Sequence, residues 1–275
     1  MRLGESSLHA CHSCGSWTCL PRPNAHAQAK IHDNTDYFDH PYFKLRRAIA
    51  PRQRQRCHEV IGRLSCALDI SSLRGERLLD IGCDTGIFLK VAQEEFGIVP
   101  VGIDVSQRAV RAALNRGVEA FGLRIEEAPA ELAGFRLVTA IDLIEHVPDP
   151  GAFLQQVRER LRPGGVLYLE TPNIRSAVYR FGRWLSSATG GRPAQLFERL
   201  FPPQHIQYFT PESLRVLAHN AGFDVVRLGT RVLPSADIAA GWAARIPISA
   251  LQAFDTIFKS EILIWTVLRR RVQEV

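Results

Sequence analysis

The sequence has little that would hold the protein in a membrane or carry it across one. No run of about 18 apolar residues occurs, which is the length that a membrane-spanning helix needs. The apolar run at 262–268 is only as long as a strand. The N-terminus, with Gly4 and Glu5 after Arg2, lacks the apolar stretch of a secretory signal. We therefore expect no transmembrane segment and a cytoplasmic protein.

Lysine is also scarce, because almost all of the 34 basic side chains are arginine. Together with 28 acidic side chains they give a net charge of +6. Basic residues gather in the segments 44–77 and 173–200, but no basic motif is interleaved with aromatic residues. We therefore expect no nucleic-acid partner. With 46% hydrophobic residues over 275 positions, the chain has enough apolar side chains for one large domain with a buried core.

The cysteines lack the second pair that a zinc site would need. Cys11 and Cys14 form one C-x-x-C pair, with His9, His12 and Cys19 nearby, which resembles half of a zinc knuckle. A structural zinc ion takes four ligands, usually from two such pairs. Residues 1–36 show no sustained period, so we expect an irregular lead-in, and of the two readings we favour a loose tail without zinc.

From residue 77 onward, strand-like and helix-like segments alternate, which predicts a doubly wound, largely parallel α/β sheet. The expected strands lie at 77–81, 99–104, 118–121, 135–143 and 166–170. The expected helices lie at 87–96, after the caps Ser106 and Asp149, and after Thr210. Before this core we expect helices over 42–70 divided by Pro51, and after it a strand at 223–228, a helical stretch over 231–258 and a last strand at 262–268.

The strongest motif is the glycine-containing sequence 78–86, Leu-Leu-Asp-Ile-Gly-Cys-Asp-Thr-Gly, where the first strand meets the first helix. Glycines let the backbone approach a ligand closely, and the helix N-terminus offers unpaired N–H groups. Asp104 ends the second strand, where a carboxylate can accept both ribose hydroxyls of an adenosine. The dinucleotide fingerprint G-x-G-x-x-G fails after Gly82, which argues against a nicotinamide oxidoreductase.

These motifs together resemble those of class I S-adenosylmethionine-dependent methyltransferases. Four segments are similar to family motifs: the first-strand motif around Gly82, Gly102–Ser106, Asp142–Pro150 and Leu161–Gly165. Thr171–Asn173 and His205–Thr210 are similar to the subgroup of ubiquinone-biosynthesis O-methyltransferases and of bacterial glycan- and natural-product-tailoring enzymes. The resemblance implies a Rossmann-like seven-stranded sheet with helices on both faces, over residues 37–275. It also implies a helical N-terminal extension, and a cap insert at 173–204 after the fifth strand.

The resemblance further implies S-adenosyl-L-methionine as the cofactor. Asp80, Gly82 and Gly86 would lie around its methionyl part. Asp104 would lie at its ribose, and Asp142 and Leu143 near its methyl group. One departure from the family is Asp84, where glycine is common, although aspartate tolerates left-handed backbone angles. The adenine contact is open, with Glu126 or Glu127 as substitutes. The cofactor-binding set is Asp80, Gly82, Asp84, Gly86, Asp104, Val105, Asp142 and Leu143.

Methyl transfer to a hydroxyl is helped by a base, and the sequence offers His146 and His205 as catalytic candidates. Asp142, Glu145 and His146 could instead ligate a divalent metal, but we favour pairing of Glu145 with an arginine and assign no metal ligand. We expect a small-molecule, glycan or lipid-linked acceptor. Arginines in the insert suggest that this acceptor is anionic: Arg175, Arg180, Arg183, Arg192 and Arg199.

Two alternatives from other classes stay open. The first is a non-catalytic protein that kept the fold and the cofactor site, which Asp84 motivates. The second is a nicotinamide oxidoreductase, against which the failed fingerprint argues. Within the methyltransferases, the runner-up is a nucleic-acid methyltransferase, but the Asn-Pro-Pro-Tyr-like motif of base-methylating enzymes is absent where Asp142-Leu143-Ile144-Glu145 stands. The sequence predicts methyl transfer more strongly than either alternative, and it leaves the oligomeric state open.

Overall fold

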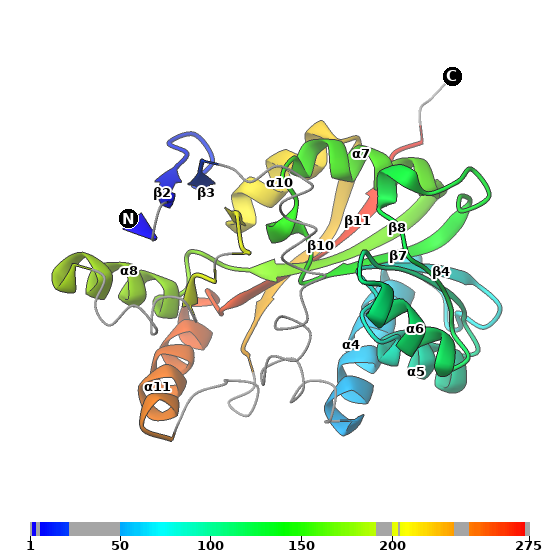
Figure 1. The fold of residues 1–275 in the computed structure, drawn as a ribbon, viewed down its shortest axis with the longest axis horizontal. Coiled ribbons are helices and arrows are strands. Elements are labelled where there is room, and N and C mark those ends of the chain that lie inside the picture. Colours follow the sequence, from blue (N-terminus) through cyan, green and yellow to red (C-terminus); the bar gives the residue numbers. More distant parts are fainter. Residues whose placement is uncertain are drawn as a thin grey trace.

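The computed structural model of the chain describes residues 2–3, 6–21, 50–190, 200–202, 204–233 and 242–272. Its main feature is a seven-stranded sheet with the order β10-β11-β8-β7-β4-β5-β6 (Figure 1). Neighbouring strands from β8 to β6 are parallel, whereas β11 is antiparallel to both β8 and β10. The expected α/β class and the seven-stranded sheet are therefore confirmed.

The strands of the large sheet fall close to the positions predicted from the apolar runs. Strand β8 is the exception, because it runs through the predicted Pro-Gly-Gly turn, with Gly164 at a φ of 73°. The strands are β4 (Arg77–Ile81), β5 (Val99–Ile103), β6 (Glu119–Phe121), β7 (Phe135–Ile141), β8 (Leu161–Pro172), β10 (Phe223–Arg231) and β11 (Leu263–Arg270).

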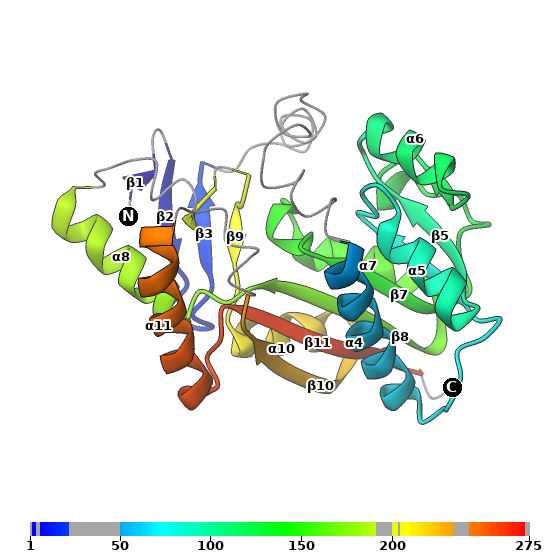
Figure 2. The same cartoon turned by 90° about the horizontal axis from the view of Figure 1, so that it is seen from below.

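Helices cover both faces of this sheet (Figures 1 and 2). On one face lie α4 (Ala50–Leu68), α5 (Ile87–Phe96) and α6 (Gln107–Asn115). On the other lie α7 (Pro150–Arg160) and α10 (Pro211–Asn220). Each of the caps predicted from the sequence accepts the expected backbone hydrogen bonds: Ser106 from Ala109, Asp149 from Gly151 and Ala152, and Thr210 from Ser213.

The N-terminal helix differs from the expected pair of helices divided by Pro51. Helix α4 has Pro51 in its first turn, where proline costs no helical hydrogen bond, and it then continues unbroken to Leu68. Cys57, Val60 and Leu64 are fully buried against the sheet at helical spacing. The first half of the expected pair, at 42–49, lies outside the described residues.

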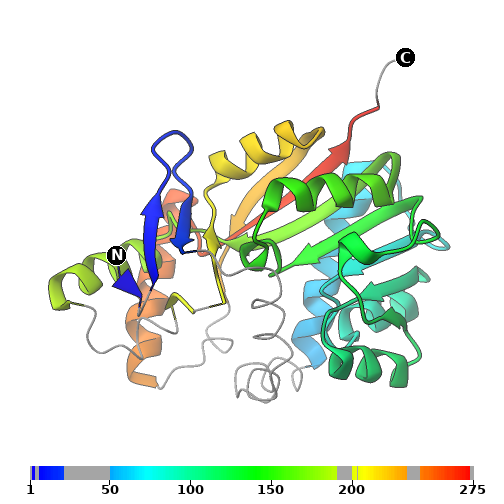
Figure 3. The ribbon, with the colours of Figure 1, turned by 45° about the horizontal axis from the view of Figure 1, so that its top comes forward.

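The sequence predicted an irregular lead-in at the N-terminus. This prediction is wrong for the residues that the structure describes, because they form strands. Strands β1 (Arg2–Leu3), β2 (Ser6–Ala10) and β3 (Trp17–Leu20) pair antiparallel, and β3 also pairs with β9 (Gln207–Tyr208) in a second sheet. Figure 3 shows this small sheet beside the large one. Leu8 and Cys19 are buried in it, against partners almost 200 positions away, which local periodicity could not reveal.

Two helices stand at the same end of the molecule as the small sheet. Helix α8 (Ala177–Thr189) lies in the predicted insert, and α11 (Trp242–Phe258) lies within the helical stretch expected at 231–258, of which residues 234–241 are outside the described ranges (Figure 1). Strand β10 continues to Arg231 instead, because it pairs with β11 along its whole length. None of the described helices is long and apolar enough to span a membrane.

Candidate functional site

The glycine-containing motif forms the loop between β4 and α5, at the carboxyl edge of the sheet. Three of its residues have left-handed backbone angles: Gly82 with a φ of 78°, Asp84 with 46° and Gly86 with 74°. The N–H groups of Gly82 and Cys83 donate to the carbonyl of Ile103 at 2.8 and 3.1 Å, so the loop is tied to the end of β5. Aspartate at 84 therefore adopts the angle for which the family commonly uses glycine.

Asp104 joins the same loop to the segment after β5. Its Oδ2 accepts the backbone N–H of Asp84 at 2.9 Å, and its Oδ1 accepts that of Ser106 at 2.9 Å. Each carboxylate oxygen has a second lone pair, so the carboxylate can still accept ligand hydroxyls while these bonds fix its orientation. Val105, from the same predicted set, is half-buried beside it.

The residues around this loop fit an adenosyl sulfonium cofactor with an amino-acid tail. Among the described residues no side chain caps the N-terminus of α5, whose cap is Gly86, so its first N–H groups can receive a carboxylate. Gly82 has a φ of 78°, which favours glycine, and a Cβ there would also lie 3.2 Å from the Leu143 side chain. Asp104, which accepts the Asp84 N–H within the loop, would supply the acceptor for the ribose hydroxyls.

Asp80 lies beneath the loop rather than on its surface. It is 5% exposed, and the Thr139 hydroxyl donates to its Oδ1 at 2.6 Å. Burial raises the pKa of Asp80 to about 7, against the opposing effect of the Thr139 hydrogen bond. A cation bound at the loop would favour the ionised carboxylate, so this residue can respond electrostatically to a sulfonium or ammonium group.

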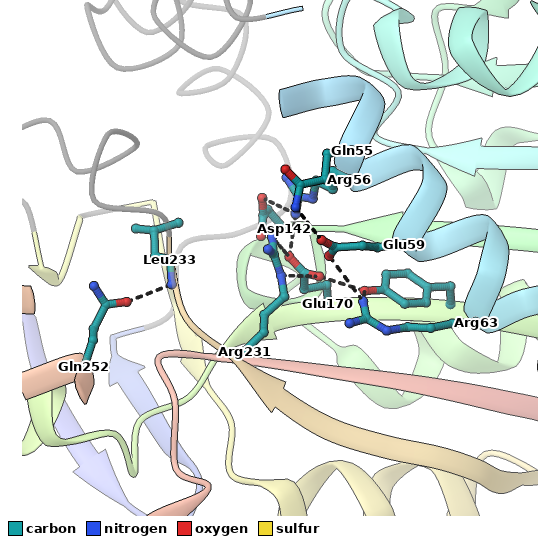
Figure 4. Close-up of polar contacts among 10 residues, drawn as sticks. Gln55, Arg56, Glu59, Arg63, Asp142, Glu170, Arg231, Leu233 and Gln252 are labelled. Atoms are coloured by element: carbon teal, nitrogen blue, oxygen red, sulfur yellow. Dashed lines mark hydrogen bonds and ion pairs between the residues drawn. The ribbon is translucent and has the colours of Figure 1, made fainter. Parts of the chain in front are cut away.

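Asp142 is held in place by a buried charge network that sequence reasoning missed (Figure 4). It follows β7 with a left-handed φ of 54°, and its Oδ2 accepts a hydrogen bond from Arg56 of α4 at 3.1 Å. Arg56 also donates to the fully buried Glu170 at 2.6 Å, and Arg231 donates to both oxygens of that carboxylate, at 2.9 and 3.1 Å. The two arginines hold the pKa of Glu170 below its usual value although burial opposes them.

The two candidate catalytic histidines meet at the carboxyl edge, although they are 59 positions apart in the chain. Their ring centroids are 4.7 Å apart at an edge-on angle of 80°. His146 Nδ1 lies 2.9 Å from the Gln204 carbonyl, which can only accept, so Nδ1 carries the proton and Nε2 is the acceptor nitrogen. Burial, and then the neighbouring His205, lower the pKa of His146 to about 3.

Glu145 completes this cluster, but not by the arginine pairing that the sequence suggested. The Thr171 hydroxyl donates to its Oε2 at 2.8 Å, whereas Arg56 binds Asp142 and Glu170. Burial raises the pKa of Glu145 to about 8, so the carboxyl is protonated at neutral pH. Glu145, His146 and His205 each bring one ligand atom within 4.8 Å of the others, so His205 takes the place of Asp142 in any metal-binding trio.

The expected adenine contacts are engaged in a turn of their own. Glu127 Oε2 accepts the backbone N–H of Arg124 at 2.9 Å, and Glu126 pairs with the Arg124 guanidinium, within and beside the short helix η1 (Ile125–Glu127). These hydrogen bonds join Glu126 and Glu127 to Arg124 and not to the glycine loop. A direct adenine contact by either residue stays a prediction.

Of the three insert arginines that the structure describes, two have partners within the protein. Arg175 pairs with Glu212 at 2.7 Å. Arg183 donates to the Ile174 carbonyl and lies 4.9 Å from the ring centre of Trp17. Arg180 is exposed on α8, whereas Arg192 and Arg199 lie outside the described residues. Of the insert aromatics, Tyr179 and Phe201 are buried, Phe181 and Trp184 are exposed, and residue 197 is not described.

Comparisons with known proteins agree with this geometry. Residues 49–228 match the methyltransferase domain family. The chain is 31% identical over 169 residues to a ubiquinone biosynthesis O-methyltransferase of Cupriavidus pinatubonensis, covering 58% of this chain and 64% of that protein. It is 30% identical over 193 residues to the Bordetella avium protein of the same name, covering 66% of this chain and 72% of that one. The chain thus spans less than two thirds of the first of these relatives.

The fold also matches solved structures. Phosphoethanolamine N-methyltransferase 2 of Haemonchus contortus, in complex with S-adenosyl-L-methionine, aligns with a TM-score of 0.58 and 17% identity. The alignment covers 93% of this chain and 63% of that one. At this identity the match shows the shared fold, and it adds nothing about the acceptor.

Proposed function

The chain belongs to the S-adenosylmethionine-dependent methyltransferase family, and on that premise we propose that it methylates a hydroxyl group of a small-molecule acceptor. The observation that carries this proposal is the contact between His146 and His205 at the carboxyl edge, where Asp142 and Leu143 follow β7. A hydroxyl acceptor must lose a proton during transfer, and imidazole is the side chain best suited to take it at neutral pH.

The cofactor supplies a methyl group already activated on a sulfonium, so the protein contributes mainly position and orientation. The N-terminus of α5 and Asp104 would hold the two ends of the cofactor. Leu143, which lies under Gly82, would limit the depth of the site. Asp142, fixed by Arg56, would keep a carboxylate near the positive charge that disappears during transfer.

Of the two histidines, we assign the base to His205. A general base works best when its pKa lies near the operating pH, and burial leaves the pKa of His146 at about 3. His205 is less buried than His146. His146 instead positions the segment that carries its partner, because its Nδ1–H holds the Gln204 carbonyl next to His205.

For the acceptor we propose a neutral phenol, such as a catechol, rather than a phosphate-linked glycan. The relatives described above are named as ubiquinone biosynthesis O-methyltransferases, which supports a hydroxyl acceptor. Of the three insert arginines that the structure describes, Arg175 is engaged with Glu212 and Arg183 with the Ile174 carbonyl, so among them the support for an anionic acceptor rests on Arg180. Glycan and lipid-linked acceptors become outcomes of the same screen.

The test combines binding and turnover. Calorimetry with S-adenosylmethionine and S-adenosylhomocysteine should show micromolar binding to the wild type and loss of binding to Asp104→Ala. Formation of S-adenosylhomocysteine is then followed with catechol, a phosphorylated sugar and aniline as acceptors. We expect turnover with catechol only, and a fall of about 100-fold in His205→Ala with unchanged cofactor affinity.

Other results would redirect the proposal. Turnover with aniline alone would assign nitrogen methylation, and turnover with the phosphorylated sugar would restore the anionic acceptor. Tight cofactor binding without turnover on any of the three would favour the non-catalytic cofactor-binding protein. If His146→Ala lost turnover while His205→Ala kept it, the assignment of the base would be reversed.

A further inference from the structure

The turn between β2 and β3 holds two cysteines that the proposed methyl transfer does not use. Cys11 and Cys14 lie at either end of a turn closed by two backbone bonds, from Cys11 N to the Ser16 carbonyl at 2.7 Å and from Gly15 N to the Cys11 carbonyl at 2.9 Å. The second bond, from residue i+4 to residue i, closes a single α-turn, in which the Cα atoms of residues i and i+3 lie roughly 5 Å apart. A disulfide spans Cα atoms about 4.4–6.8 Å apart, so the turn geometry admits one.

The surroundings of Cys11 favour its thiolate. The side chain is exposed, and its Sγ lies 3.1 Å from the Ser13 hydroxyl. That hydrogen bond, followed by those from the backbone N–H groups of Cys14 and Ser13, lowers the pKa of Cys11 to about 6. The Cys14 side chain is half-buried in the same turn, where its Sγ lies 3.1 Å from the Ser16 hydroxyl, so a second thiol stands three positions after the first.

A metal is a poorer occupant of this turn. Zinc needs four ligands, and no group of three or more metal-ligating side chains forms around Cys11 and Cys14 among the residues that the structure describes. Exposed, activated cysteines beside a second cysteine are the usual arrangement of reversible thiol oxidation. The pair therefore has the features of a reactive thiol and of its resolving partner.

We propose that Cys11 and Cys14 form a redox-active dithiol that is oxidised to an intramolecular disulfide by low-molecular-weight disulfides such as glutathione disulfide. The Cys11 thiolate attacks one sulfur of glutathione disulfide, the S–S bond breaks, and one glutathione thiolate leaves. Cys14 then loses its proton to solvent and attacks the Cys11 sulfur of the mixed disulfide, and the second glutathione thiolate leaves and is protonated. The protein loses two hydrogens, and one glutathione disulfide becomes two glutathiones.

The other cysteines provide internal contrasts. Cys57 and Cys83 are buried, and burial raises the pKa of Cys57 to about 12 and that of Cys83 well above its ordinary value. Cys66 is exposed on α4, far along the chain from the turn, and it serves as the matched control for an accessible thiol. Cys11 and Cys66 are both exposed, so a faster reaction of Cys11 than of Cys66 could not be explained by exposure alone.

The turn is connected to the proposed catalytic segment by short hydrogen bonds. The Thr210 hydroxyl donates to the Cys14 carbonyl at 3.1 Å, and the Cys19 N–H donates to the Ile206 carbonyl at 2.9 Å. Ile206 in turn donates its N–H to the Glu145 carbonyl at 3.0 Å. A change of backbone at the turn would therefore reach the strand that follows His205.

The test uses the full reduced chain incubated with glutathione disulfide and analysed by intact and peptide mass spectrometry. The wild type and Cys66→Ser should both lose about 2 Da, with Cys11 and Cys14 in one cross-linked peptide. Cys14→Ser should accumulate a glutathione adduct of about 305 Da on Cys11, because the mixed disulfide cannot be resolved. Cys11→Ser should react at least tenfold more slowly than the wild type.

Three results would overturn the proposal. The first is labelling of Cys66 at the rate of Cys11, which would reduce the turn to an ordinary exposed thiol. The second is a glutathione adduct that persists on Cys11 in the wild type, which would show that Cys14 cannot resolve it. The third is zinc that copurifies with the chain and protects both thiols from reaction, which would make the turn a metal site.

Discussion

At the scale of single residues, the site depends on backbone angles that few side chains tolerate and on carboxyl groups removed from water. Gly82, Asp84 and Asp142 have left-handed angles where β4 and β7 meet the site. Asp80 and Glu145 are nearly fully buried, and burial raises the pKa of both. These features place strain and perturbed carboxyls at the same edge of the sheet, as is common for functional sites.

The raised pKa of Asp80 predicts a pH-dependent cofactor affinity. Below its pKa of about 7 the carboxyl is neutral, and above it the carboxylate attracts the sulfonium and ammonium of S-adenosylmethionine. Affinity should rise as the pH increases from 5 to 7, by up to about tenfold per pH unit, and should level off above pH 7, where the free carboxyl is already ionised. Calorimetry on the wild type and on Asp80→Asn isolates this effect, because the variant lacks the titrating group. Parallel pH profiles of the two proteins would exclude Asp80 as its source.

Glu145 predicts a pH dependence of stability instead. Its pKa is about 8 in the folded protein and 4.5 for the ordinary group, so the fold keeps a proton that the unfolded chain releases. This stabilisation is complete below pH about 4.5 and is lost as the pH rises towards 8. Glu145→Gln should therefore gain stability relative to the wild type over that window, by at most roughly 1.4 kcal/mol per pH unit.

Urea unfolding of both proteins at pH 5, 6, 7 and 8 measures this difference. The opposite effect of His146, whose lowered pKa costs stability as the pH falls below 6.5, is common to both proteins and cancels in the comparison. A constant difference across the four pH values would mean that Glu145 is ionised in the folded protein at neutral pH.

At the scale of helices and strands, the sequence predicted what local signals encode. Ser106, Asp149 and Thr210 cap the helices that follow them, and the apolar runs mark five parallel strands within a few residues. It missed the contacts that depend on distant partners. The pairing of β3 with β9 and the link from Arg56 to Glu170 join segments more than 100 positions apart, and no local period records them.

Arg56 links α4 to Asp142 and Glu170, which predicts that two arginines on that helix contribute unequally to stability. Arg56→Met would leave Asp142 without this partner and would remove one of the two arginines that neutralise Glu170, so we expect a loss of about 3 kcal/mol in unfolding free energy. Arg54, two residues earlier, pairs with Glu95 and is 57% exposed. Arg54→Met should therefore cost less than about 1 kcal/mol. Equal losses in chemical unfolding would contradict a structural role for the network.

At the scale of the whole molecule, the two sheets support different parts of the proposed site. Strands β4, β5 and β7 of the large sheet carry the glycine loop, Asp104 and Asp142. The small sheet backs the segment of His205 through β9 and buries Leu8 and Cys19 against Ile206 and Tyr208. The residues of the proposed cofactor site could be predicted from family motifs. The pairing of the N-terminal strands with β9, next to the proposed base His205, is visible only in the three-dimensional structure.

This division predicts that the N-terminal hairpin supports turnover and not cofactor binding. Deleting residues 1–21 would remove the strand that pairs with β9 and would expose Tyr208, which is fully buried. We expect the affinity for S-adenosylhomocysteine to stay within about threefold of the wild type, and turnover to fall about tenfold or more because the His205 segment loses its support. Thr18→Val, which removes only the hydrogen bond to Gln207, is the mild control. Joint loss of binding and turnover in calorimetry and activity assays would instead mean that the two sheets fold as one unit, since unfolding of the small sheet would then take the glycine loop with it.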